Sequence, residues 1–155
     1  IQTARRINNS MPHFVVEQVK RMTAELEAPV IAVFGLTYKG NTDDVRESPA
    51  IEIYEELRRN ERFDVRAYDP HVKPSQVPFP LSTKEEALDG AHLVVVLADH
   101  NEFKTLTAEE LASMKTKVIF DTKNCIGLDD EDVTVYQIGH LSVVQAIQEQ
   151  PPERV

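Results

Sequence analysis

Three short runs of apolar and β-branched residues, each bounded by turn or polar residues, most constrain the fold of this chain. They are Val30 to Leu36, Leu93 to Ala98 and Val118 to Asp121. Nearly continuous apolar runs of this length are typical of strands covered on both faces, as in a parallel sheet. The segments between them have the periodicity of amphipathic helices, so the sequence predicts repeated strand–helix–strand units.

The predicted fold class is α/β: an open, mainly parallel Rossmann-like sheet with helices on both faces, preceded by an N-terminal helical arm. The arm spans residues 1–27, and Pro12 is expected to begin a second helix within it. The α/β domain spans residues 28–142, and the weakly patterned tail, 143–155, is expected to be poorly ordered. Because the chain begins inside a helical pattern without Met, we interpret it as part of a longer protein.

The remaining elements follow from capping and periodicity. Ser48 and Pro49 predict the start of a helix that runs to about Asn60. Thr107, with Glu110 three residues later, has the pattern of a capping box. Further elements are expected at residues 64–68, 82–88, 108–114 and 134–138. Since ligands of open parallel sheets bind beyond the carboxyl ends of the strands, the loops that follow the strands are the candidate sites.

Composition excludes several classes of function. The formal net charge of -9 disfavours a large nucleic-acid or anionic-membrane surface, because such surfaces rely on Lys and Arg. No apolar run approaches the roughly 20 residues that a membrane helix needs. The single cysteine, Cys125, fits a reducing compartment, so a cytoplasmic location is expected.

Neither a catalytic residue nor a metal site is predicted in this chain. The five histidines lack metal-ligand spacing, and the acidic run 129–132 lacks the glycine of a calcium loop. Cys125 has no activating base near it in the sequence, so it is expected to pack in the core or in a loop.

The stretch G-L-T-Y-K-G-N-T, residues 35–42, nearly matches a phosphate-binding P-loop. A P-loop requires Lys directly after its second Gly, but Asn41 stands there and Lys39 comes too early. The dinucleotide pattern G-x-G-x-x-G is also absent after this strand. Without that pattern, Asp69 is expected to form an Asp-Pro turn rather than to bind a ribose.

Three cations nonetheless follow predicted strands. Lys39 and Arg46 precede the helix start at Ser48, and the amino end of a helix attracts anions. Alternatively, Arg46 forms a solvated ion pair with the acids around it. Lys123 follows another strand and can reach the same crevice as Lys39, or it can lie in an exposed turn.

Three blocks carry a resemblance to a known family: F-G-L-T-Y-K-G-N-T-D-D-V-R-E-S-P-A, Y-D-P and F-D-T-K-N. Their order and spacing resemble the C-terminal UDP-binding domain of the UDP-glucose/GDP-mannose dehydrogenase family, up to about His140. These enzymes use NAD to oxidise a UDP-hexose to a uronic acid in two hydride transfers. The D-T-K-N form, with N-S-M-P-H-F-V-V-E, looks more like the UDP-N-acetylmannosamine dehydrogenases than the UDP-glucose enzymes.

The resemblance implies roles for four residues. Tyr38, Lys39 and Lys123 are expected to contact the UDP-sugar, and Arg46 is expected to reach the NAD site. Lys123 replaces the Arg usual in UDP-glucose members, which keeps the charge but loses the bidentate fork. NAD would be bound mainly by an N-terminal domain that also supplies the catalytic Cys, so this chain alone is expected to be inactive.

The opening A-R-R-I-N-N-S-M-P is similar to the end of the long helix that helps these enzymes to dimerise, so a homodimer or higher homo-oligomer is expected. The implied pathway is nucleotide-sugar metabolism for polysaccharide biosynthesis. UDP-glucose and UDP-N-acetylglucosamine are alternative substrates. A stand-alone nucleotide-binding α/β module without catalysis is the alternative from a different class.

Overall fold

The computed structural model describes residues 2–138, with side chains described from Pro12 onward. Its strands form one parallel sheet in the order β2-β1-β3-β4-β5. The strands are β1 (Val30–Phe34), β2 (Asp64–Tyr68), β3 (Leu93–Val96), β4 (Val118–Asp121) and β5 (Thr134–Gln137). The helices are α1 (Gln2–Met22), α2 (Pro49–Arg58), α3 (Lys84–Leu88) and α4 (Asn101–Lys104). Two 3-10 helices lie at η1 (Pro74–Gln76) and η2 (Glu109–Leu111). The predicted fold class is therefore confirmed.

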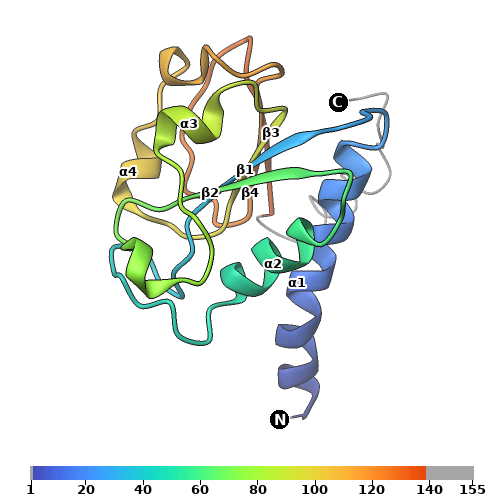
Figure 1. Ribbon diagram of the computed structural model, residues 1–155, viewed down its shortest axis with the longest axis vertical. Coiled ribbons are helices and arrows are strands. Elements are labelled where there is room, and N and C mark those ends of the chain that lie inside the picture. The colour runs from blue at the N-terminus through green and yellow to red at the C-terminus, as the bar shows by residue number, and fades with distance from the viewer. Residues whose placement is uncertain (1, 139–155) are drawn as a thin grey trace.

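The sheet separates two layers of helices (Figure 1), with α1 and α2 on one face and α3, α4 and η2 on the other. Because side chains alternate along a strand, each central strand supplies both layers. In β1, Ile31 and Val33 belong to the core beneath α1 and α2, whereas Ala32 and Phe34 belong to the opposite core. This double coverage explains why the central strands are nearly all apolar.

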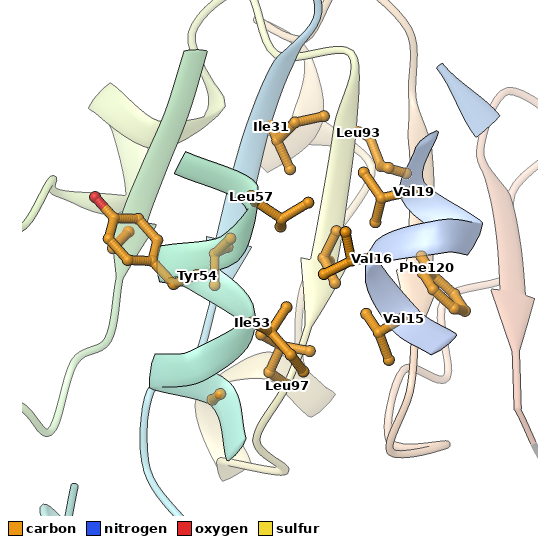
Figure 2. Packing of buried hydrophobic residues seen from close by; sticks show 14 of the residues in the cluster. Val15, Val16, Val19, Ile31, Ile53, Tyr54, Leu57, Leu93, Leu97 and Phe120 are labelled. Atoms are coloured by element: carbon orange, nitrogen blue, oxygen red, sulfur yellow. The ribbon is translucent and has the colours of Figure 1, made fainter. Parts of the chain in front are cut away.

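The core beneath α1 and α2 is shown in Figure 2. Val16 and Val19 of α1 pack beside Ile53 and Leu57 of α2, all of them buried. The helix α2 begins as predicted, because the Ser48 hydroxyl caps it by accepting a hydrogen bond from the Ala50 amide at 3.2 Å.

The predicted break at Pro12 is wrong, because α1 runs through this proline without interruption. Proline removes one N–H from the helical ladder, which usually interrupts a helix. Here the turns that follow Pro12 bury Val15, Val16 and Val19 against the sheet, and this packing favours continuing the helix. The helix ends at Met22, before the predicted limit of residue 27. The predicted tail, 143–155, lies outside the described residues.

Two smaller differences lie in the connection between β3 and β4. The segment 108–114 was expected to be helical, but only η2 forms, although Thr107 and Glu110 make the predicted capping box. The helix α4 was not predicted, because it is only four residues long.

Candidate functional site

A hollow of about 380 Å³ lies at the carboxyl edge of the sheet. It is lined by residues that follow β1, β3 and β4: Tyr38, Lys39, Gly40, Asn41, Asp99, Lys104 and Lys123. Three of the four residues predicted from sequence, Tyr38, Lys39 and Lys123, are therefore brought together. With three lysines and one aspartate, the lining carries a net positive charge suited to an anionic ligand.

A second hollow, of about 580 Å³, shares Tyr38 and Lys123 with the first. It extends towards α1, where Val15 contributes to the lining, and to the amino end of α2 at Ser48. Tyr38 is 55% exposed, so this large apolar ring stands in solvent where the two hollows meet. The arrangement offers a flat aromatic surface beside a group of cations.

The loop that carries Lys39 is fixed by a buried carboxylate. Asp69, at the end of β2, accepts a hydrogen bond from the Leu36 amide at 2.7 Å and another from the His71 amide at 2.8 Å. Its third partner is His100, whose Nε2 lies 2.9 Å from the carboxylate. The turn predicted for Asp69 is confirmed, and all these partners lie within the protein, which argues against a role in binding a ribose.

Two glycines let this loop approach β3 closely. Gly35 has a φ of 99°, and a Cβ there would lie 2.6 Å from that of Ala98. A Cβ on Gly40 would lie 2.3 Å from the Asp99 carboxylate oxygen Oδ1. Gly35 and Gly40, which gave the stretch its likeness to a P-loop, therefore allow the ends of neighbouring strands to lie in close contact.

A second buried carboxylate fixes the loop that carries Lys123. Asp121 is fully buried and accepts hydrogen bonds from the amides of Lys123 at 3.0 Å and Ile126 at 2.8 Å, and from the Gln137 side chain at 2.8 Å. The thiol of Cys125 lies beside it. Burial, together with the negative charge of Asp121, raises the pKa of Cys125 to about 12. A thiol with this pKa stays protonated at neutral pH, which agrees with its predicted packing role.

Arg46 is not brought to the hollow. Its guanidinium makes two hydrogen bonds with the Asp44 carboxylate, at 3.0 and 3.1 Å, on the surface of the same connection. These hydrogen bonds from Arg46 lower the pKa of Asp44 to about 2. The solvated ion pair weighed as an alternative for Arg46 is therefore present.

Volume alone does not select the site. A hollow of about 540 Å³ lies between α3 and η2, away from the loops that follow the strands. Its ionisable residues are Lys84, Glu85, Glu86, Asp89, Glu109 and Glu110. Five carboxylates around one lysine, which is already paired with Glu110, would repel a phosphate. The cationic hollow at the strand ends is the better candidate.

Asp99 and Lys104 were missed by sequence reasoning. Both lie after β3, and Lys104 belongs to α4, an element too short for a periodic signal. Their position in the connection that follows an apolar run was the one signal that could have found them. Within residues 2–138, no group of three or more His, Cys, Asp or Glu side chains is placed to hold a metal ion. Over the same residues, no helix is long and apolar enough to cross a membrane.

The fold and the three lysines define a Rossmann-like domain with a cationic hollow at the ligand edge of its sheet. A comparison with known families is more specific. Residues 32–128 match the UDP binding domain of the UDP-glucose/GDP-mannose dehydrogenase family. The chain belongs to this family.

Individual relatives agree with this assignment. The chain is 40% identical over 146 residues to a UDP-N-acetyl-D-mannosamine dehydrogenase of Methanocaldococcus jannaschii, a match that covers 90% of this chain and 33% of the relative. It is also 40% identical over 126 residues to an NDP-N-acetyl-D-galactosaminuronic acid dehydrogenase of Ralstonia nicotianae, covering 79% of this chain and 29% of the relative.

A solved structure gives the same result. The UDP-N-acetyl-mannosamine dehydrogenase of Staphylococcus aureus is 46% identical, with a TM-score of 0.83, and the match covers 93% of this chain and 34% of that one. The chain thus spans about a third of the length of these relatives.

Proposed function

We propose that this chain is the UDP-sugar-binding part of an NAD-dependent UDP-sugar 6-dehydrogenase, and that the sugar is UDP-N-acetylmannosamine. The observation that carries the proposal is the meeting of Tyr38, Lys39 and Lys123 around one hollow at the ligand edge of the sheet. Two or three ammonium groups can neutralise a diphosphate, while Tyr38 offers an apolar surface beside it.

Arg46 is proposed to serve the cofactor. The Arg46 side chain is 86% exposed and forms a surface ion pair with Asp44. A phosphate or carboxamide of NAD, bound to another domain, can therefore take the place of Asp44 at a small cost in free energy. NAD would be bound mainly by that other domain, where it accepts hydride from the substrate. Alone, this chain is expected to bind UDP but not to turn over substrate.

The first test is a UDP titration of the chain followed by NMR. Lys39→Ala should weaken UDP binding by about 1.5 to 3 kcal/mol, or roughly 10- to 150-fold, since it removes a charge-assisted hydrogen bond. Lys115→Ala is the matched control, because this exposed lysine precedes β4 at the opposite edge of the sheet. Equal binding by Lys39→Ala and the wild-type chain would refute the proposed site.

The second test addresses the sugar. Relatives of equal identity are named for different substrates, so identity alone does not choose among them. A protein that contains this chain and a complete NAD domain is expected to reduce two NAD per UDP-N-acetylmannosamine. Activity with UDP-glucose or UDP-N-acetylglucosamine instead would keep the family and reject the specificity. The homo-oligomer and the cytoplasmic location stay predictions, which ultracentrifugation and cell fractionation would test.

A further inference from the structure

Behind the Lys39 loop lies a histidine that no part of the proposed function uses. His100 follows β3 and is fully buried, with its ring 4.4 Å from the ring of His71. Its Nδ1 lies 2.8 Å from the amide nitrogen of Asn41, two residues after Lys39. Its Nε2 lies 2.9 Å from the buried carboxylate of Asp69. His100 therefore joins the ends of β2 and β3 to the loop that follows β1.

The hydrogen bonds assign the tautomer of this ring. A backbone amide can only donate, so Nδ1 of His100 must accept from Asn41 and carries no proton. The single proton of the neutral ring is then on Nε2, where it is donated to Asp69. Both nitrogens are used inside the protein, so His100 is not placed to touch a ligand in the hollow.

The contact helps to hold the loop in an uncommon backbone conformation. Asn41 has a φ of 60°, in the left-handed region that non-glycine residues rarely adopt. Asn41 also accepts a hydrogen bond, through its side-chain oxygen, from the Asn101 amide at 2.9 Å. On the other side of Lys39, the Thr37 hydroxyl donates to the Lys39 carbonyl at 2.6 Å. The backbone of Lys39 is thus restrained from both directions.

We propose that His100 is a positioning residue of the UDP-sugar site: it acts through the Asn41 amide to hold Lys39 at the hollow. The inference rests on the proposed function. Asp69 fixes the ring of His100, the ring fixes the loop, and the loop backbone that carries the lysine needs no ordering when the diphosphate binds.

Two substitutions separate this role from a contribution to stability. In His100→Gln the side-chain amide can still donate to Asp69, but no acceptor remains at the position of Nδ1 for the Asn41 amide. In His100→Asn the carbonyl oxygen occupies the place of Nδ1 and can accept from Asn41, while the donor to Asp69 is lost. UDP titrations followed by NMR are expected to show binding about three- to tenfold weaker for His100→Gln, and within about twofold of wild type for His100→Asn.

The matched control is His92→Gln. His92 Nδ1 accepts from the Val30 amide at 3.0 Å, which is the same kind of contact at the opposite end of the strands. Its loss should leave UDP binding unchanged. Equal effects of His92→Gln and His100→Gln on UDP affinity would show that both act through stability alone, and would overturn the inference.

A double-mutant cycle tests whether the effect of His100→Gln on UDP affinity depends on Lys39. In a Lys39→Ala background, His100→Gln should change UDP binding by less than about twofold, because the group that it positions is absent. An undiminished loss in that background overturns the inference while leaving the proposed function intact. A Lys39→Ala variant that binds UDP normally overturns both.

If His100→Gln does not fold, the wild-type chain still decides the matter. A scalar coupling across the hydrogen bond between the Asn41 amide and His100 Nδ1 is expected by NMR, and it should persist when UDP is added. Its presence, together with near-normal UDP binding by His100→Asn, supports the inference, and its absence overturns it.

Discussion

Lys39 and Arg46 lie seven residues apart in the same connection between β1 and α2, yet they are held in opposite ways. The Lys39 segment is anchored to buried groups, Asp69 and His100, that come from other strand ends. The Arg46 side chain instead forms an exposed pair with Asp44, two residues away in the same connection. Lys123 resembles Lys39, since buried Asp121 anchors its loop.

The difference separates what this chain organises by itself from what it leaves open. The backbone of a loop fixed by buried hydrogen bonds is in place before a ligand arrives, and binding then loses less free energy in ordering that loop. A surface pair such as Asp44–Arg46 contributes little and exchanges readily. The contrast fits the proposal that Lys39 and Lys123 serve a ligand of this domain, whereas Arg46 serves one held elsewhere.

The largest expected effect tests the buried anchor. Asp69→Ala would leave the Leu36 and His71 amides and His100 Nε2 without their acceptor, and should lower the free energy of unfolding by about 3 to 5 kcal/mol. Urea denaturation measures this. Asp64→Ala is the control, because it removes only an exposed pair with Arg66 and should cost less than about 1 kcal/mol. Similar losses in the two variants would remove the contrast between buried and exposed carboxylates.

A smaller effect tests the close approach of the loop to β3. Gly40→Ala would place a methyl group 2.3 Å from Asp99 Oδ1 and 2.5 Å from the Asp99 carbonyl oxygen. The loop must shift, so the free energy of unfolding should fall by about 1 to 3 kcal/mol, and the affinity for UDP should fall with it. Gly127→Ala meets no atom within 4 Å and should be near neutral in both measurements. An equally stable Gly40→Ala variant would show that the loop is not held against β3.

The Arg46 segment should respond weakly to the same measurements. Arg46→Ala is expected to leave the midpoint of urea denaturation and the affinity of this chain for UDP unchanged within error. Its side chain is 86% exposed and lines neither hollow at the strand ends. A loss of UDP affinity as large as that of Lys39→Ala would place Arg46 in the UDP site and break the comparison.

The smallest expected effect is on the titration of Asp44. The Arg46 guanidinium donates hydrogen bonds to the ionised carboxylate, which lowers the pKa of Asp44 from 3.8 to about 2. A lowered pKa in the folded state means that the pair stabilises the fold above about pH 4 and is lost as the pH falls towards 2. The carboxyl carbon shift, followed by NMR, reports the midpoint. Arg46→Ala should raise the midpoint only part of the way to the ordinary range, because the amide of residue 46 still donates to Asp44 at 3.0 Å. An unmoved midpoint would mean that the guanidinium does not cause the shift.

Much of the fold could be predicted because its signals are local. The strands at 64–68 and 118–121 and the helix start at Ser48–Pro49 were predicted to the residue, since apolar runs and caps mark them within a few positions. The helix α4 was missed, as four residues carry no periodicity. The path of α1 through Pro12 was missed because packing on the sheet, rather than local preference, decides it.

The residues of the candidate site were likewise predictable where the signal is local and unpredictable where it depends on contacts between distant residues. Lys39 and Lys123 could be named because they follow apolar strands, where a parallel sheet binds its ligands. The partnership of Asp69 with His100 could not, because the two are 31 residues apart and nothing near either one indicates the other. An isolated histidine after a strand is as consistent with a surface turn as with a buried hydrogen-bond network.

The order of the strands also has a consequence for synthesis. The strand β1 lies between β2 and β3, so the loop that follows β1 receives its two anchors from segments made later. Lys39 is synthesised before both anchors, and the ring that restrains it, at residue 100, follows the third strand. About sixty residues beyond Lys39 must therefore leave the ribosome before this lysine acquires its place.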